Sequence, residues 1–511
     1  MSETSSNNKR IAKNTAMLYI RMLLIMAVTL YTSRVVLEVL GVEDFGIYNV
    51  VGGIVVLFTF INNAMVTATQ RFLNYELGRK DQQATVHVFS ASITIHIAIA
   101  LLTLVLAETV GLWFLNHYIQ YPEGRDVAVH FTYQFSILAT CLNIIRAPYN
   151  AAIIAHERMS FYAYISVIEV ILRLLIVYLL LISSIDRLIL YAILMFGVVL
   201  VITVSYYIYC KRQFSVCHYT YFWDQSIYKQ LVSFSGWSMF GGLANMGASQ
   251  GLNILLNLFY GVTVNAAMGI ANQVNAAVYS FVSNFQTAFN PQIVKSYAAK
   301  ETAYFIDLII RTSKYSYFLL FFISLPIYIC CEEVLSLWLK EVPDYTVSFC
   351  RLMILFSLLD AIQGPLWVSV QATGKIRNYQ ILMSIMILSN LPLSYLFLKL
   401  SFEAEWVLII RCLLNFLTLF VRLWYLQRLY SFPVQRYLKE VIGRVFIVSL
   451  LSLSLLFIPI ENVYPLIKVI IVVLVSFVFN LILIYSIGLE YKERGLIKKQ
   501  IQKIYEQHKR N

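Results

Sequence analysis

Fourteen long apolar stretches, separated by short polar connections, make up most of this 511-residue chain. Each could cross the hydrocarbon core of a bilayer, which takes about 20 helical residues. Only 13% of the residues are charged, against about 25% in soluble domains. The pattern predicts an all-α integral membrane protein with about 14 transmembrane helices. We place them at residues 15–40, 46–69, 88–114, 126–150, 161–183, 188–209, 231–259, 264–289, 313–331, 345–371, 378–398, 403–425, 441–460 and 464–487.

Lys and Arg are distributed unevenly between the two sets of connections. If the N-terminus is cytoplasmic, the even-numbered connections and both tails hold 29 of the 39 basic residues, and the odd-numbered connections hold five. Short cytoplasmic loops carry such an excess of basic residues. We therefore expect a multi-pass protein of the bacterial cytoplasmic (inner) membrane, with both termini in the cytoplasm. The net charge of +12 then reflects orientation in the membrane, and no nucleic-acid partner is expected.

The longest polar connection, at residues 211–230, falls near the middle of the chain. It predicts two six-helix bundles around a central cavity, joined by a cytoplasmic linker. The predicted parts are residues 1–210, the linker 211–230, residues 231–430, two further helices at 431–488 and a basic cytoplasmic tail at 489–511. At a constant offset of 220, Gly41 falls on Gly261 and Lys80 on Lys300. This favours an internal repeat whose halves have parallel topology.

Five arginines lie inside the apolar stretches: Arg21, Arg34, Arg173, Arg351 and Arg411. An arginine in hydrocarbon costs at least ~2.5–3.5 kcal/mol, so it faces a protein interior, a water-filled cavity or a counter-charge. Arg173 follows Glu169 by four residues, which leaves a structural ion pair and a functional role equally open. Arg21 either reaches the interface or lines a cavity, and Arg411 lacks an acid at helical spacing, which favours an inter-helix or cavity role.

Amide side chains also enter the predicted spans, where each must find a hydrogen-bond partner. Helix–helix packing is one explanation, and a hydrated cavity that binds hydroxyl-rich ligands such as sugars is the other. The candidate substrate-binding residues are Arg21, Arg34, Arg173, Arg411, Asn62, Asn63, Asn245, Gln250, Asn272 and Gln273. Arg71 and Arg146 lie at the inner ends of their helices, where they either form a cytoplasmic vestibule or follow the positive-inside rule.

Three titratable residues inside the spans, Glu38, Asp360 and His96, are candidates for ion coupling. Asp360 could equally pair with Arg411, and His96 could be a satisfied packing residue. The chain has no P-loop and no metal-ligand or paired-carboxylate motif, so we expect no metal, no cofactor and no enzymatic activity. The seven cysteines form no CxxC pair, and we expect isolated, reduced thiols.

The segment SRVVLEVLGVEDFGIYN at residues 33–49 resembles the Wzx-type polysaccharide (O-antigen) flippases. These belong to the MOP superfamily, the multidrug/oligosaccharidyl-lipid/polysaccharide exporters. The helix count, the cytoplasmic termini and the polar helices fit the resemblance along essentially the whole length. Cationic cavity residues are a theme of that family, and the matching positions are Arg34, by the motif, and Arg21, by its place early in the first helix.

The resemblance implies alternating access and a polyprenyl-diphosphate-linked oligosaccharide as substrate, moved from the inner to the outer leaflet for surface polysaccharide (lipopolysaccharide) biosynthesis. Protons, Na⁺ or the membrane potential would drive the movement. The implied partners are the lipid-linked substrate, membrane lipids and a glycan polymerase, with the protein itself a monomer. Two alternatives stay open: a cation-coupled multidrug exporter of the same superfamily, and a membrane-embedded glycan polymerase or acyltransferase.

Overall fold

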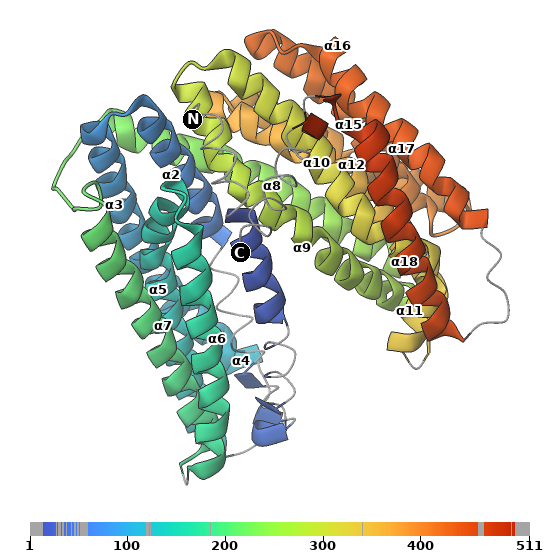
Figure 1. Ribbon diagram of the computed structural model, residues 1–511. Helices are drawn as coiled ribbons and strands as arrows, with labels where there is room; N and C mark the ends of the chain where they lie inside the picture. The colour runs from blue at the N-terminus through green and yellow to red at the C-terminus, as the bar shows by residue number, and fades with distance from the viewer. Residues whose placement is uncertain are drawn as a thin grey trace, which may run out of the picture. The chain divides into compact units, whose positions relative to one another are not determined.

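The computed structural model describes residues 14–26, isolated positions between 28 and 51, and residues 60–118, 122, 124–183, 185–339, 341–457, 464–491 and 493–495. These residues form helices joined by short connections, and none of them is in a strand (Figure 1). Within this described part, nine helices are long and apolar enough to cross a membrane. The prediction of an all-α membrane protein is therefore confirmed.

The helices of the first half of the chain correspond in order to predicted spans, although the helix predicted at 46–69 continues to Arg79. They are α2 (Phe60–Arg79), α3 (Gln82–Leu106), α4 (Leu112–Tyr118), α5 (Asp126–Ala155), α6 (Met159–Ile182) and α7 (Arg187–Gln213). A π-helical turn at Ala107–Gly111 joins α3 to α4, so that Gln82–His117 forms one long span. Asp186 caps the start of α7, where its carboxylate accepts hydrogen bonds from two backbone N–H groups. Such capping satisfies donors that the first turn of a helix leaves free.

Two helices near the middle of the chain are both long and polar. They are α8 (Gln225–Tyr260) and α9 (Val262–Ala298). With 36 residues and a rise of 1.5 Å per residue, α8 is about 54 Å long, well above the bilayer core of about 30 Å. Neither helix is among the nine apolar spans, because serine, glycine, asparagine and glutamine replace many of the apolar residues.

The second half of the chain also follows the predicted spans, with one added short helix, α11. The helices are α10 (Thr302–Ile329), α11 (Cys331–Trp338), α12 (Thr346–Thr373), α13 (Arg377–Leu388), α14 (Asn390–Lys399), α15 (Trp406–Tyr430), α16 (Val434–Tyr437), α17 (Arg444–Ser452) and α18 (Pro465–Leu483). Of these, α13 and α14 together make one span, Arg377–Lys399.

The chain divides into two units that alternate along the sequence. Unit 1 contains residues 1–242, 287–302 and 371–380, and unit 2 contains residues 243–286, 303–370 and 381–511. Helices α8, α9, α12 and α13 therefore each begin in one unit and end in the other, and α10 does so by its first residue, Thr302. The predicted domains are continuous stretches of sequence, and their boundaries stay a prediction.

The turns that end four of the helices support the predicted internal repeat. Gly41 and Gly261 have φ values of +78° and +80°, and Lys80 and Lys300 both have φ of +59°. In both lysine turns the lysine N–H bonds the carbonyl three residues earlier, and the next N–H bonds the carbonyl five residues earlier. This is the left-handed turn that commonly closes a helix. The same conformation thus recurs at the same offset of 220 residues, after α2 and again after α9.

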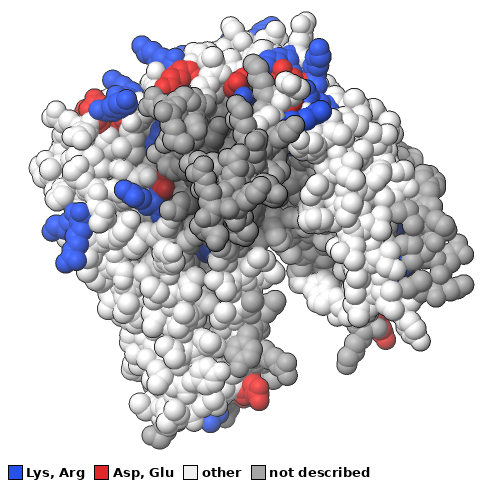
Figure 2. All heavy atoms as spheres, viewed as in Figure 1, with Lys and Arg blue, Asp and Glu red and all other residues white. Residues whose placement is uncertain are grey.

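Each unit has its own apolar core. In unit 1, Tyr133 and Ile137 of α5 are fully buried in a cluster with Leu115 and Leu188. In unit 2, Leu252 of α8 is buried in a cluster that includes residues of α9, α11, α12 and α15. On the visible face of each unit, charged side chains lie mostly near the ends of the helices and leave a broad neutral surface (Figure 2). Such a surface suits contact with lipid.

Candidate functional site

One face of α6, in unit 1, carries four polar side chains in an otherwise apolar helix. Tyr162, Ser166, Glu169 and Arg173 follow one another at intervals of four, three and four residues. This spacing places all four on the same side of the helix. The sequence analysis used only the last pair. The full series predicts a polar stripe along about half of α6, the half that contains its N-terminus.

Arg21 contacts the N-terminal part of this stripe, at Tyr162 and Ser166. Its Nε donates a hydrogen bond of 2.8 Å to the Ser166 hydroxyl, and its guanidinium carbon lies 4.2 Å from the centre of the Tyr162 ring. Both contacts are with neutral groups, and no ion pair of Arg21 is found within the described part of the chain. The half-buried guanidinium therefore has no carboxylate partner among the described residues.

Arg146, from α5, approaches the same region. Its guanidinium carbon lies 5.4 Å from the centre of the Tyr206 ring, and its Nη1 is buried with no hydrogen-bond partner among the described residues. Tyr206 is within electrostatic range of both Arg146 and Arg21. The structure thus brings together two arginines that the sequence analysis assigned to different places, a binding site and a vestibule.

Arg173 extends the series toward the other end of α6. It donates a hydrogen bond of 2.6 Å to Glu169 and lies within electrostatic range of Tyr48 and Tyr191, whose rings are 4.9 Å apart. We call Arg146, Arg21 and Arg173, with the tyrosines beside them, the guanidinium column. It holds three positive groups against one carboxylate, Glu169. The two positive charges left over match an anion with about two negative charges, such as a diphosphate.

The interior of unit 2 holds a second group of charged side chains. Arg411 contacts the Met353 sulfur, at 3.8 Å, and the Phe356 ring, at 4.2 Å. Asp360 accepts a hydrogen bond of 2.7 Å from the Tyr279 hydroxyl and acts on Arg411 only through space. The sequence analysis left open a direct pair between Arg411 and Asp360, and the described residues show no such ion pair.

A further arginine of unit 2, Arg422, was not singled out from the sequence. It donates a hydrogen bond of 2.9 Å to the backbone oxygen of Gln363, and the side chain of Gln363 bonds the Asn415 side chain at 2.8 Å. Hydrogen bonds thus connect polar residues of α12 and α15 within unit 2.

The remaining candidate residues have varied surroundings. Arg34 lies outside the described residues. His96 is fully buried, its Nδ1 is 2.7 Å from the Ser92 backbone oxygen, and its Nε2 is buried without a hydrogen-bond partner among the described residues. Asn62 and Asn272 are half-buried, and the exposed candidates are Glu38, Asn63, Asn245, Gln250 and Gln273.

Arg71 is buried in unit 1 and caps a helix. Its Nε and Nη2 donate hydrogen bonds of 3.0 and 2.9 Å to the backbone oxygens of Gln371 and Ala372, at the end of α12. Gly374 follows with φ of +76°, and a Cβ there would lie 2.8 Å from Arg71 Nη2. A cation at this end of a helix is favourable because the free carbonyls carry partial negative charge. The contact explains why glycine occupies position 374.

A buried carboxylate lies in the same unit. Glu157 is 3% exposed and accepts hydrogen bonds of 2.7 and 2.8 Å from the Gln292 amide, and of 2.7 Å from Lys295. Arg71 and Glu157 thus both hold helix ends in unit 1, one the end of α12 and the other the end of α9.

The motif at residues 33–49 contains a structural residue that the sequence analysis missed. Asp44 pairs with Arg125, which also pairs with Asp186 at the start of α7. Burial alone would raise the pKa of Asp186, but hydrogen bonds from Arg125 and from backbone N–H groups outweigh it, and the pKa lies below its usual value. Arg125 therefore joins three connections of unit 1.

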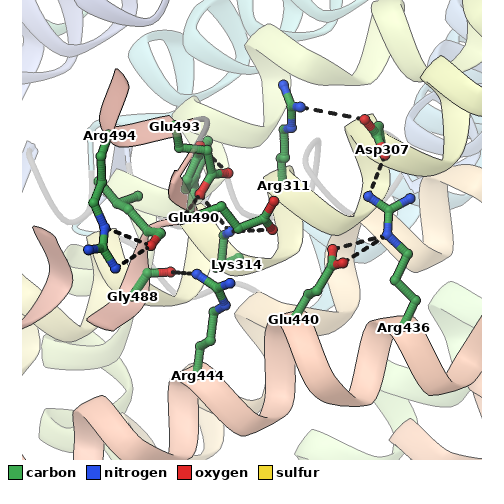
Figure 3. Close-up of polar contacts among 12 residues, drawn as sticks. Asp307, Arg311, Lys314, Arg436, Glu440, Arg444, Gly488, Glu490, Glu493 and Arg494 are labelled. Carbon is green, nitrogen blue, oxygen red and sulfur yellow. Dashed lines mark hydrogen bonds and ion pairs between the residues drawn. The ribbon is translucent and has the colours of Figure 1, made fainter. Parts of the chain in front are cut away.

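Unit 2 contains a buried ion cluster that was also missed. Lys314 of α10 is fully buried and donates hydrogen bonds of 2.8 Å to Glu493 and 3.3 Å to Glu490 (Figure 3). The Tyr315 hydroxyl donates a further bond of 2.6 Å to Glu493. We call these four residues the C-terminal clasp. Burial would raise the pKa of Glu493, but hydrogen bonds from the Glu490 N–H, Lys314 and Tyr315 hold it below the usual value.

Comparison with known proteins gives a match in fold but none in sequence. No protein-family model matches the chain, and no curated protein matches its sequence. An outward-facing multidrug resistance MATE family transporter of the MOP superfamily has a TM-score of 0.70 and 14% identity, over 84% of this chain and 97% of that one. MATE in the bent conformation has a TM-score of 0.69, again with 14% identity and coverages of 84% and 97%.

A third solved structure is a MOP superfamily transporter from Pyrococcus furiosus Vc1, whose reverse polarity of the binding pocket suggests a different function. It has a TM-score of 0.66 and 14% identity, over 82% of this chain and 96% of that one. The described chain therefore has the fold of a multi-pass membrane transporter. More particularly, it has the fold of the MATE family transporters of the MOP superfamily.

Proposed function

We propose that this protein is a flippase that moves a polyprenyl-diphosphate-linked oligosaccharide from the inner to the outer leaflet of the bacterial cytoplasmic membrane by alternating access. The observation that carries the proposal is the guanidinium column of unit 1. There, Arg173 pairs with Glu169, whereas Arg146 and Arg21 contact only neutral groups among the described residues. A diphosphate supplies the negative charge that this arrangement lacks.

The chemistry of the column suits a diphosphate better than a single carboxylate. Guanidinium groups bind phosphate oxygens through pairs of N–H donors. Arg146 has a buried Nη1 without a partner among the described residues, and a buried donor of this kind is costly unless an acceptor reaches it. The rings of Tyr162 and Tyr206 lie beside the arginines, and a tyrosine hydroxyl can hydrogen-bond sugar hydroxyls.

The polar faces of two helices support the sugar part of the proposal. Asn245 and Gln250 of α8 and Gln273 of α9 are exposed, although hydropathy would favour apolar residues at lipid-facing positions. In unit 2, Arg411 adds a positive group with no described ion pair. The polyprenyl chain would stay in lipid throughout, because it is apolar.

The membrane potential favours the proposed direction. Outward movement of about two negative charges releases ~2.3 kcal/mol per charge per 100 mV when the inside is negative. Exchange with protons or Na⁺ would add to this, with Asp360, Glu38 and His96 as candidate residues. We propose no metal or cofactor, and a glycan polymerase that uses the product would be the partner of a monomeric flippase.

A cation-coupled multidrug exporter is the second candidate, because the fold suits it equally. The contact between Asp360 and Tyr279 favours that reading, since an acid in the interior can bind a cation. A positively charged binding site would favour the flippase, and an acidic binding site would favour the exporter. A glycan polymerase or acyltransferase has weaker support, because the described outer connections are short.

The test is transport of a fluorescent polyprenyl-diphosphate glycan in proteoliposomes. We expect movement above lipid-only controls, and a loss of about tenfold or more in R21Q/R146Q, because each charged hydrogen bond contributes about 1.5–3 kcal/mol. R21K/R146K should retain part of the activity, and R158Q, at an exposed position, should retain all of it.

Transport no faster than in lipid-only vesicles would refute the proposal, as would equal activity of R21Q/R146Q and R158Q. Drug resistance in a strain that expresses the protein, without glycan transport, would instead support the exporter.

A further inference from the structure

Two cysteines of unit 2 that are 19 positions apart in the sequence meet in the fold. Cys331 begins α11 and Cys350 lies near the start of α12. The two side chains interact with one another, and the Cys331 thiol donates a hydrogen bond of 3.8 Å to the Val347 backbone oxygen, one helical turn before Cys350. Both are free cysteines, as the sequence analysis expected, but they interact with one another.

The surroundings hold both thiols in place. Cys331 and Cys350 are 2% and 1% exposed and belong to one buried cluster with Phe349 and Leu335. A second contact fixes α11 from the other side, because Glu333 pairs with Lys468 of α18. The Cys331 side chain thus stays against the start of α12. A disulfide between them would place the sulfurs ~2.05 Å apart.

A second thiol pair offers a comparison within the same chain. Cys210, at the end of α7, and Cys217, in the connection to α8, also interact with one another and are both buried. In the predicted topology this pair lies on the cytoplasmic side, whereas α11 and the start of α12 lie on the outer side. Thiols in the bacterial cytoplasm are kept reduced, and those outside it are oxidised by disulfide exchange.

We propose that Cys331 and Cys350 form a disulfide in the mature protein, while Cys210 and Cys217 remain thiols. The oxidant is a thiol–disulfide oxidoreductase of the outer compartment. One S–S bond forms between the two cysteines, and their two electrons and two protons pass to the disulfide of the oxidoreductase, which becomes a dithiol. The bond would tie α11 to α12 and, together with the Glu333–Lys468 pair, fix the outer end of unit 2.

The first experiment uses the wild-type protein in its own membrane. Intact cells are denatured in N-ethylmaleimide, which blocks every free thiol, and the purified protein is digested without reduction. Peptide mass spectrometry should find Cys331 linked to Cys350, and Cys210 and Cys217 both alkylated. No variant is needed, so a failure to fold cannot confuse the result.

The second experiment counts the thiols. After blocking, the protein is reduced and labelled with PEG-maleimide, which should add two polymer chains. C331S and C350S should each lose both additions. C330S, whose cysteine neighbours Cys331 but is not part of the pair, should keep them. Alkylation of all seven cysteines before reduction would overturn the proposal, and so would a disulfide between Cys210 and Cys217 with Cys331 and Cys350 free.

Discussion

The C-terminal clasp allows a quantitative test of how unit 2 is held together. Glu493→Gln removes the negative charge from the carboxylate that is closest to Lys314, at 2.8 Å. Lys314 is 0% exposed and Glu493 is 4% exposed, so the lysine cannot turn to water. The variant leaves a buried ammonium group with only Glu490 nearby, at 3.3 Å and 23% exposed.

The expected loss follows from burial. Removal of one partner of a buried ion pair costs ~3–5 kcal/mol, because the remaining charge is uncompensated. Removal of both charges costs much less, since a buried pair is often no more stable than apolar residues of similar size. K314M/E493Q should therefore recover most of the stability that E493Q loses. Glu490→Gln should cost about 1 kcal/mol, as expected for a partly exposed partner.

Thermal unfolding of the purified protein in detergent measures these differences. The matched control is Glu440→Gln, which removes an acid from a pair with Arg436, 41% exposed, and should cost ~0.2–1 kcal/mol. E493Q should unfold at a clearly lower temperature than E440Q, and K314M/E493Q should lie between E493Q and the wild type. The reasoning fails if E493Q and E440Q unfold together, or if K314M/E493Q is no more stable than E493Q.

Two further predictions concern unit 1 and pH. Arg71→Met should lower the free energy of unfolding by about 3 kcal/mol or more, because two charge-assisted hydrogen bonds of about 1.5–3 kcal/mol each are lost. Gly374→Ala should also destabilise the protein, because position 374 has a positive φ and the Arg71 nitrogen lies close to it. Thermal unfolding compares both variants with Lys375→Ala, and equal stabilities would contradict the capping role. The pKa of Glu493 is lower in the folded than in the unfolded protein, so its contribution is complete above the unfolded value of about 4.3 and is lost as pH falls through the lower folded value. Unfolding temperatures measured from neutral to acidic pH should fall less steeply for E493Q than for the wild type, and parallel curves would contradict this assignment.

Features that depend on nearby residues could be predicted from the sequence. The spans follow from the lengths of the apolar stretches, and the structure places most helix ends within a few residues of the predicted ones. The contact between Glu169 and Arg173 follows from their spacing of four. Gly41 and Gly261 could be aligned because a left-handed turn favours glycine. In each case the chain itself fixes the distance between the interacting groups.

Features that depend on distant residues could not be predicted. Lys314 has the same surroundings in sequence as any basic residue near a cytoplasmic end, yet its acidic partners come 176 and 179 residues later. Arg71 binds backbone oxygens, which every residue possesses and which therefore leave no mark in the sequence. Asp44 was inside a recognised motif, but its partner Arg125 has no spacing that identifies it.

The hydrogen bond from Arg21 to Ser166 has a consequence for how the protein is made. Ser166 is synthesised 145 residues after Arg21, which takes about 7–30 s at 5–20 residues per second. During that interval the first helix carries a charge whose insertion costs about 2.5–3.5 kcal/mol and which has no α6 beside it. Arg173, by contrast, enters the membrane with Glu169 already in its own helix. The helix that carries Arg21 is thus synthesised well before the α6 residue that it finally contacts.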